Sequence, residues 1–258
     1  MAFECTACRN VCGEFSLLCP WCGAWLTLRE GAGEEQEAAA IPLTAVMPPA
    51  VARRTTGIDR IDALLGGGFV AGSSVLLTGA PGAGKSTLLL QILSASATAA
   101  LYVSGEEASE QIKMRANRLG INSPAIAIAF ETNIRPVLAY VRKHPPVFCV
   151  IDSIQTMYTD ASDSLPGSVT QIRKCTYVLR RLAQEKGMVL LIVGQVTKGL
   201  QAAGPKMLEH AVDVVVSLSV QERDPAIRLL SVSKNRFGPA GCSLPLCMAG
   251  GGFRFDAG

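Results

Sequence analysis

A glycine-rich stretch limits what this chain can fold into more than any other feature of the sequence. It reads Gly79-Ala80-Pro81-Gly82-Ala83-Gly84-Lys85-Ser86 and fits the pattern G-x-x-x-x-G-K-[S/T] at every fixed position. The apolar run 73–78 before it predicts a short buried strand, and the apolar run 87–94 after it predicts a helix. Glycines let backbone N–H groups converge on an anion, and a helix N-terminus adds partial positive charge. The stretch therefore predicts a phosphate-binding loop, because a chance glycine-rich turn would not bring the strand, the helix, the lysine and the hydroxyl together.

The loop assigns roles to particular side chains. Lys85 is expected to reach the β- and γ-phosphates of ATP, and Ser86 is expected to ligate Mg²⁺. The other residues predicted to contact the nucleotide form the loop or follow it directly, and they are Gly79, Gly82, Ala83, Gly84 and Thr87.

Strand-like and helix-like segments alternate after the loop. This alternation predicts an α/β fold with a mainly parallel, wound sheet. Two more strand-like runs follow each other closely near the end and predict an antiparallel extension. Before the loop, residues 53–68 predict a short amphipathic helix stopped by glycines. The expected strands after the loop are 101–104, 125–130, 147–151, 189–193, 212–220 and 227–234, and the expected helices are 109–119, 134–143 and 169–185.

Polar side chains stand where the predicted parallel strands end, which is where functional groups collect in such sheets. Asp152 follows an apolar run, the pattern of an aspartate that holds Mg²⁺ through water. Glu106 is the candidate for polarising the attacking water, with Glu107 as the alternative. Gln195 is placed to sense the γ-phosphate.

Two cations, Lys234 and Arg236, stand at the end of the last predicted strand. At the period of two residues in a strand, both point to the same side. Such a pair suits a phosphate group. An ordinary solvated sheet edge is the alternative interpretation.

Two Cys-x2-Cys pairs lie close to the N-terminus. Cys5, Cys8, Cys19 and Cys22 have the spacing of a tetrahedral structural zinc site, and Cys12 is a spare thiol that could replace one ligand in another register. So short a polar segment has too few apolar residues to fold without the metal. A closed site of four cysteines is not catalytic and usually supports a contact surface.

The order of these motifs and the composition between them predict the domain boundaries and the cellular compartment. We expect a zinc element at 1–28, a flexible Ala-, Glu- and Pro-rich linker at 29–52, and an ATPase domain at 53–258. The sequence has no apolar run long enough to span a membrane and no secretory signal, so we expect a cytoplasmic protein whose nine cysteines are metal ligands or reduced thiols.

Positive charge is unevenly distributed along the chain. The first 52 residues carry a net charge of −4 and the remainder +7. A basic main domain suits a polyanionic partner, although nucleotide binding also favours positive charge.

Taken together, these motifs resemble the RadA family, also called Sms, of bacterial RecA-like DNA repair ATPases. The resemblance is carried by the four-cysteine element, the phosphate loop and several further stretches. It implies a RecA-like core, ATP hydrolysis with Mg²⁺, and a ring of identical chains that binds single-stranded DNA and drives branch migration of recombination intermediates. The further matching stretches are Thr56-Gly57-Ile58, Leu65-Gly66-Gly67-Gly68, Tyr102-Val103-Ser104-Gly105-Glu106-Glu107, residues 111–120, Asp152-Ser153-Ile154-Gln155-Thr156, Val196-Thr197-Lys198, residues 204–210 and Lys234-Asn235-Arg236-Phe237-Gly238.

The resemblance also implies where DNA and the neighbouring chain would meet this one. Loops 156–168 and 197–209 should face the centre of the ring, where Lys198 and Lys206 would follow a phosphate backbone. Disordered surface loops are the alternative for these two segments. Lys234 and Arg236 should reach the nucleotide of the adjacent subunit.

The chain departs from the family pattern at three points, which limits the family properties that can be expected of it. Ala80 stands where the family usually has Asp, and Gln195 where it usually has His. The sequence ends at Gly258, while the family continues into a Lon-protease-like domain, so we expect the core without that domain. The other functions considered are a RecA-like signalling ATPase that acts on protein, a binding module that keeps its nucleotide as a structural ligand, and a small-molecule kinase.

Overall fold

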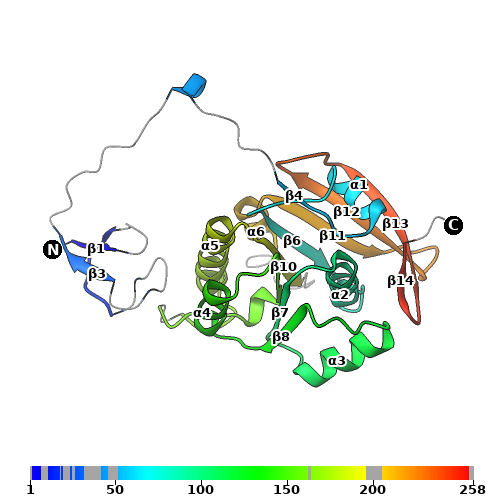
Figure 1. Cartoon of the computed structure of the whole chain (residues 1–258), viewed down its shortest axis with the longest axis horizontal. Coiled ribbons are helices and arrows are strands. Elements are labelled where there is room, and N and C mark those ends of the chain that lie inside the picture. Colours follow the sequence, from blue (N-terminus) through cyan, green and yellow to red (C-terminus); the bar gives the residue numbers. More distant parts are fainter. Residues whose placement is uncertain are drawn as a thin grey trace.

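The computed structural model describes residues 2–6, 11–17, 19, 24, 27–31, 42–45, 52–161, 164–195 and 205–255. Predictions on Cys8, Cys22 and Lys198 lie outside the described residues, as does the prediction on the side chain of Lys206. The described part consists of a large α/β core and, at the N-terminus, a small three-stranded sheet (Figure 1).

A nine-stranded sheet forms the centre of the core, in the order β14-β13-β12-β11-β6-β10-β9-β7-β8. Six neighbouring strands are parallel, and three antiparallel strands extend the sheet beyond β11. The predicted mainly parallel sheet is therefore confirmed. The parallel strands are β6 (Ser74–Gly79), β7 (Ala100–Ser104), β8 (Ile126–Phe130), β9 (Phe148–Asp152), β10 (Val189–Gln195) and β11 (Val214–Val220), and the antiparallel strands are β12 (Ile227–Asn235), β13 (Cys242–Ala249) and β14 (Gly252–Arg254).

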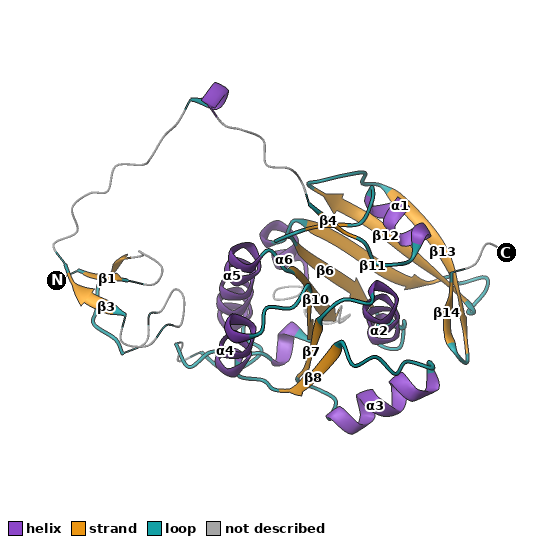
Figure 2. Ribbon diagram, in the orientation of Figure 1, coloured by secondary structure: helices purple, strands orange, loops and turns teal. Residues whose placement is uncertain are grey.

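Helices cover both faces of the sheet, as Figure 2 shows. One hydrophobic core joins α1, α2 and α3 to one face, and a second core joins α4, α5 and α6 to the other. Strands buried on both faces explain the near-continuous apolar runs that the sequence shows at β6, β9 and β10. The helices are α1 (Asp59–Leu65), α2 (Lys85–Ser96), α3 (Ser109–Arg118), α4 (Ile134–Lys143), α5 (Val169–Lys186) and α6 (Pro205–Ala211), with short 3₁₀ turns η1 (Leu43–Ala45) and η2 (Ile154–Thr156).

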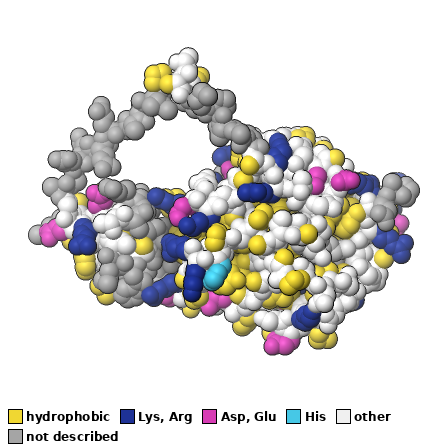
Figure 3. Space-filling view, viewed as in Figure 1, with side chains coloured by type: hydrophobic (Ala, Val, Ile, Leu, Met, Phe, Trp, Pro, Cys, Tyr) yellow, Lys and Arg dark blue, Asp and Glu magenta, His cyan; other side chains and the backbone are white. Residues whose placement is uncertain are grey.

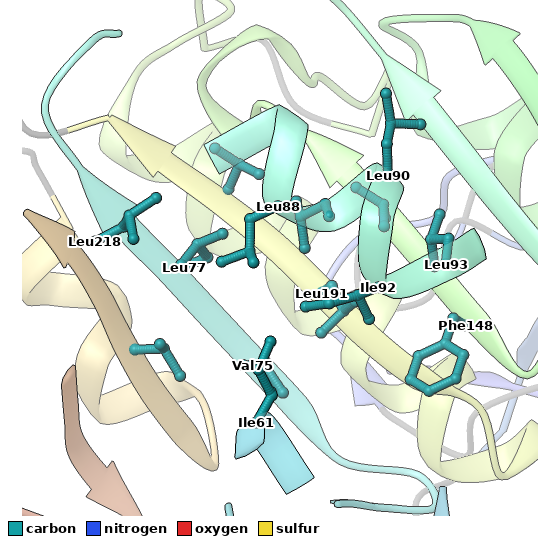
Figure 4. Close-up of a cluster of buried hydrophobic side chains, with 14 of the residues drawn as sticks. Ile61, Val75, Leu77, Leu88, Leu90, Ile92, Leu93, Phe148, Leu191 and Leu218 are labelled. Carbon is teal, nitrogen blue, oxygen red and sulfur yellow. The ribbon is translucent and has the colours of Figure 1, made fainter. Parts of the chain in front are cut away.

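Helix α2, which follows the phosphate loop, is held by apolar contacts with the middle of the sheet. Leu88 and Ile92 project from the helix toward Leu77 and Leu191 of the strands beneath, as Figure 4 shows. All four side chains are at most 4% exposed. This burial fixes the start of α2 relative to the ends of β6 and β10.

Two features of the core were not predicted from the sequence. Strands β13 and β14 were not predicted, because Pro245 interrupts the first and glycines surround the second. A two-stranded ribbon, β4 (Arg53–Arg54) with β5 (Phe69–Val70), brackets α1. The expected helix in 53–68 is limited to α1, which ends where Gly66 adopts a left-handed φ of 78°.

The N-terminal sheet has the order β2-β1-β3 and consists of β1 (Phe3–Cys5), β2 (Val11–Cys12) and β3 (Leu28–Glu30). Cys5, Cys12 and Cys19 are buried together with Leu28 in one small cluster. Among the described residues, no group of three or more His, Cys, Asp or Glu side chains is arranged to hold a metal. The four-cysteine zinc site therefore stays a prediction, since two of its ligands lie outside the described residues. No helix in the part of the chain that the structure describes is long and apolar enough to cross a membrane.

Candidate nucleotide-binding site

The predicted phosphate loop joins β6 to α2, as expected, and its glycines are required by close contacts. Gly79 has a φ of 154°, and a Cβ there would lie 2.3 Å from the carbonyl oxygen of Leu218. Gly84 has a φ of 103°, and a Cβ there would lie 2.9 Å from the ring of Phe253. A side chain at either position would clash with Leu218 or Phe253 and displace the loop, so these glycines allow the backbone to lie close to the sheet.

Lys85 lies inside the curve of the loop. Its Nζ donates hydrogen bonds to the carbonyl oxygens of Gly79 at 2.9 Å and Ala80 at 3.0 Å. Burial lowers the pKa of Lys85, and the nearby carboxylates of Asp152 and Glu106 partly offset that effect. The ammonium group is thus held where the phosphates of a nucleotide would enter.

Ser86 and Asp152 form the part of the site that suits Mg²⁺. The Ser86 hydroxyl donates to Asp152 Oδ2 at 2.6 Å, and the Tyr102 hydroxyl donates to the same oxygen at 2.5 Å. Burial, followed by the charge of Asp152, raises the pKa of Tyr102 well above its usual value, so the phenol keeps its proton. A hydroxyl beside a carboxylate, at the mouth of a phosphate loop, is the oxygen-rich donor set that Mg²⁺ prefers.

Glu106 stands at the centre of a hydrogen-bonded group. Ser153 donates its hydroxyl to Glu106 Oε1 at 2.5 Å, and Gln195 Nε2 lies 2.9 Å from both carboxylate oxygens of Glu106. The peptide bond between Asp152 and Ser153 is cis. The carboxyl ends of β7, β9 and β10 thus bring these side chains together.

Glu107, the alternative to Glu106, is engaged elsewhere. Arg115 of α3 donates two hydrogen bonds, of 2.5 and 2.6 Å, to its carboxylate. The hydrogen bond to Glu107 is also the main cause of the raised pKa of Arg115. Because both oxygens of Glu107 are held by a cation, the geometry favours Glu106 as the residue that acts on water.

A single open pocket collects these groups, and α3 and β13 complete its wall. The sequence patterns assigned no individual role to five residues at or beside the site, namely Tyr102, Ser153, Arg115, Arg118 and Met248. The first four stand in stretches that carry the family resemblance, but no pattern gave them individual roles, and Met248 belongs to the unpredicted β13. The pocket is lined by Pro81, Gly82, Gly84, Lys85, Ser86, Thr87, Glu106, Glu107, Arg115, Arg118, Asp152, Gln195 and Met248.

Lys234 and Arg236 do not line this pocket. Lys234 Nζ donates to the carbonyl oxygens of Glu209 at 2.6 Å and Val212 at 2.7 Å, next to the end of α6. Burial, followed by the charge of Arg236, lowers the pKa of Lys234. Arg236 Nη1 lies 3.3 Å from Asp213 Oδ1.

Asp213 shows which end of the sheet these cations occupy. Its Oδ2 accepts hydrogen bonds from the backbone N–H of Ser74 at 3.0 Å and from the Ser74 hydroxyl at 2.6 Å. Ser74 begins β6 and Gly79 ends it, so the two cations lie roughly 17 Å from the phosphate loop of their own chain, at the rise per residue of a strand. The predicted role of Lys234 and Arg236 toward a neighbouring nucleotide stays a prediction.

The predicted DNA loops are described only in part. Lys198 lies outside the described residues, and Lys206 belongs to α6, where its side chain is not described. Of the first loop, residues 156–161 and 164–168 are described, and Gln171 of α5 holds that loop by hydrogen bonds with Thr159 and Ser164.

Comparison with known proteins agrees with this fold. A protein-family profile described as "ATPase: KaiC" matches residues 54–129. Among solved structures, the RadB recombinase has a TM-score of 0.60 at 22% identity over 78% of this chain and 98% of its own, which shows the fold alone. A KaiC-like protein of Pyrococcus horikoshii has a TM-score of 0.65 at 25% identity over 79% of this chain and 98% of its own.

Curated relatives are more similar in sequence. The DNA repair protein RadA of Bacillus subtilis is 42% identical over 253 residues, which is 92% of this chain and 55% of the relative. The DNA repair proteins RadA of Aquifex aeolicus and Pseudomonas aeruginosa are 40% and 42% identical over similar shares, 93% and 92% of this chain and 56% and 55% of the relatives. The chain thus spans about half the length of the curated relatives it matches. Over the part that it shares with them, with a RecA-like core and a complete phosphate loop, this chain belongs to the RadA family.

Proposed function

We propose that this chain is a DNA-dependent ATPase of recombinational DNA repair, which binds single-stranded DNA and drives branch migration of recombination intermediates. The observation that carries the ATPase part is the meeting of Lys85, Ser86, Asp152 and Glu106 in one pocket. The names of the curated relatives, DNA repair protein RadA, support the repair part.

Each residue of the pocket has a defined task in this proposal. Lys85 binds the β- and γ-phosphates together with the backbone N–H groups of the loop. Ser86 and Asp152 hold Mg²⁺, which when bound neutralises charge on the phosphate oxygens. Glu106 accepts a proton from the attacking water, and Gln195 fixes the orientation of the Glu106 carboxylate through its two 2.9 Å contacts.

We also propose that the site is completed between two chains of a ring. Lys234 and Arg236 lie at the amino end of the sheet, away from the pocket of their own chain, so they can act only on a nucleotide bound elsewhere. The Arg236 side chain is 54% exposed and remains available to a neighbouring subunit. A cation supplied in this way stabilises the charge that develops during phosphoryl transfer.

Gln195 connects the pocket to the segment proposed to bind DNA. Residues 196–204 follow Gln195 directly, and Gln155 of η2 donates its side-chain amide to the carbonyl oxygen of Gln195 at 3.3 Å. Gln155 directly precedes the first proposed DNA loop and Gln195 stands two residues before the second, so both loops follow residues linked to the Glu106 group. DNA held by Lys198 and Lys206 would change the position of Gln195 and, through it, of Glu106.

The proposal is tested by ATP turnover measured with and without single-stranded oligo-dT. Turnover is expected to rise with DNA, to disappear in Lys85→Ala, and to lose its DNA response in Lys198→Ala/Lys206→Ala. Lys113→Ala/Arg223→Ala serves as a control with the same charge change at exposed positions outside the pocket. If the unaltered protein hydrolyses ATP at the same rate with and without DNA, the proposal is contradicted. It would favour the second candidate, a signalling ATPase that acts on protein, for which the match to the KaiC profile is the supporting observation.

We further propose that Cys5, Cys8, Cys19 and Cys22 hold a structural Zn²⁺. Two of these thiols, Cys5 and Cys19, are fully buried in the same small cluster, and thiolates are preferred zinc ligands. Among the described residues, the cluster around these thiols contains few other apolar side chains, so the metal would supply much of the folding free energy of this element.

A further inference from the structure

The outer faces of α4 and α5 concentrate positive charge far beyond the average of the chain. The whole sequence is nearly balanced, with 24 Lys and Arg residues against 21 Asp and Glu. Helices α4 and α5 together contain eight Lys and Arg residues and one acidic residue, Glu185. Figure 3 shows Lys and Arg side chains gathered on the side of the molecule where these two helices lie.

Several of these cations have internal partners. Arg180 lies 3.7 Å from Asp213, Lys174 donates to the carbonyl oxygen of Ala161, and Lys186 lies 3.4 Å from Glu185. Within the described ranges, no acidic side chain is paired with Arg142, Lys143 or Arg173, all of which are exposed. Cations kept exposed and near one another repel, and a polyanion relieves that repulsion.

Exposed aromatic rings stand among these cations. Tyr140 of α4 is 42% exposed and Tyr177 of α5 is 43% exposed. Tyr177 lies one helical turn from Arg173 on the same face, and the Tyr140 ring packs against His144 with ring centroids 5.1 Å apart. Rings on which bases can stack, set beside cations that bind phosphates, characterise surfaces for single-stranded nucleic acid.

The two helices present these side chains on one continuous surface. The N–H of Ile134, which begins α4, donates to the carbonyl oxygen of Tyr158 at 3.0 Å, and the next residue, Thr159, donates its N–H to Gln171 in the first turn of α5 at 3.0 Å. Both helices precede parallel strands and pack on the same face of the sheet. They therefore run in the same direction, side by side, with their exposed faces adjoining.

We propose that the outer faces of α4 and α5 form a second binding surface for single-stranded nucleic acid, in which Arg142, Lys143 and Arg173 contact phosphates and Tyr140 and Tyr177 stack on bases. This surface adjoins loop 156–168, which contacts the first turns of both helices, but it does not include Lys198 or Lys206, the cations assigned to DNA under the proposed function. It goes beyond that function, because a chain with two such surfaces can hold two strands of a branched intermediate at once.

The first test measures binding of fluorescein-labelled oligo-dT by anisotropy over a range of salt concentrations. Arg142→Gln/Lys143→Gln/Arg173→Gln should weaken binding and reduce the slope of log K against log salt by about 2, if all three cations contact phosphates of a single strand. Lys113→Gln/Arg223→Gln/Arg254→Gln removes the same charge from exposed positions elsewhere and should leave the slope unchanged. Light scattering and binding of a fluorescent ATP analogue should not change in either variant. If the two triple variants bind oligo-dT alike, the surface is not a nucleic-acid site.

The second test separates base stacking from attraction to any polyanion. Tyr140→Ala/Tyr177→Ala should weaken oligo-dT binding by about fivefold or more, while Tyr140→Phe/Tyr177→Phe, which keeps both rings, should bind as the unaltered protein does. Unchanged affinity in the alanine variant would overturn the proposal. So would competition by poly-glutamate as effective as that by oligo-dT at equal charge, since it would point to an acidic protein partner.

These outcomes are distinguishable from failure of the loop hypothesis. If Lys198→Ala/Lys206→Ala binds DNA normally while the α4–α5 variants do not, the helical surface stands and the loops are excluded. If the reverse holds, the helical surface is excluded and the loops stand.

Discussion

Gln195 and Glu106 are joined by the side-chain amide of the glutamine, whose Nε2 lies 2.9 Å from each oxygen of the carboxylate. The two residues come from the ends of different strands, β10 and β7, which are separated in the sheet by β9. Their contact fixes the direction in which the Glu106 carboxylate points. It also connects Gln195, the residue directly before segment 196–204, to the proposed chemistry.

Replacing Glu106 should separate ATP binding from ATP hydrolysis. Glu106→Gln removes the group that accepts a proton but keeps its size, so the variant should bind a fluorescent ATP analogue normally and lose at least about a hundredfold in turnover. Glu107→Gln is the matched control, and it should retain turnover because both oxygens of that carboxylate are already hydrogen-bonded to Arg115. Wild-type turnover in Glu106→Gln, measured by phosphate release, would move the role to another residue.

Replacing Tyr102 should weaken the response to Mg²⁺. Tyr102→Phe removes the hydroxyl that donates to Asp152 Oδ2 and leaves the ring in place. Without that donor the Asp152 carboxylate is less well oriented, so the Mg²⁺ concentration needed for half-maximal binding of the ATP analogue should rise several-fold. Tyr140→Phe, which alters an exposed ring, is the control. An unchanged Mg²⁺ titration in Tyr102→Phe would show that the hydrogen bond does not position Asp152.

Replacing Phe253 should destabilise the core and disturb the phosphate loop together. Its ring is 4% exposed and packs beside Gly84, and its backbone exchanges two hydrogen bonds of 2.8 and 2.9 Å with the Gln91 side chain of α2. Phe253→Ala should lower the free energy of unfolding by about 3–5 kcal/mol, as measured by urea denaturation. Phe130→Ala, at a site 57% exposed, should change it by less than about 0.5 kcal/mol. Equal midpoints in the two variants would show that the Phe253 ring does not stabilise the core.

Mixing two inactive variants should restore activity if the site is shared between chains. Arg236→Ala should bind ATP normally but hydrolyse it slowly, because arginines supplied from a neighbour contribute about 10³–10⁵ in rate in other phosphoryl-transfer systems. Lys85→Ala keeps an intact Arg236, so a mixture should regain part of the turnover, and specific activity should rise with protein concentration. Full activity of a monomeric sample, verified by light scattering during the assay, would exclude the shared site.

Metal analysis should find one zinc per chain in freshly purified protein. Structural zinc contributes about 10–16 kcal/mol in small zinc-binding peptides. Cys5→Ser/Cys8→Ser should therefore lose the metal and unfold the N-terminal element while the core keeps its binding of the ATP analogue. Cys247→Ser, which changes an exposed thiol of β13, should keep both. Absence of zinc from the unaltered protein would refute the site.

Local sequence patterns were enough to predict the architecture of the core and the phosphate loop. Long apolar runs in alternation with amphipathic segments leave little choice but a parallel sheet between helices, and glycines with a lysine and a serine at fixed spacing define the loop that joins β6 to α2. These are local patterns, which is why helix α4 was placed at residues 134–143 and strand β8 was predicted within one residue of its observed start.

Which of the candidate groups lie together followed only from the assembled fold. Nothing in the local pattern distinguishes Glu106 from Glu107, because only packing of α3 places Arg115 against the second and only the order of strands places Ser153 and Gln195 against the first. The same holds for Lys234, which spacing suggested as a phosphate ligand and which the fold sets against the carbonyl groups at the end of α6. Contacts of this kind join residues distant in sequence, and their free energy depends on an assembled core that no short segment contains.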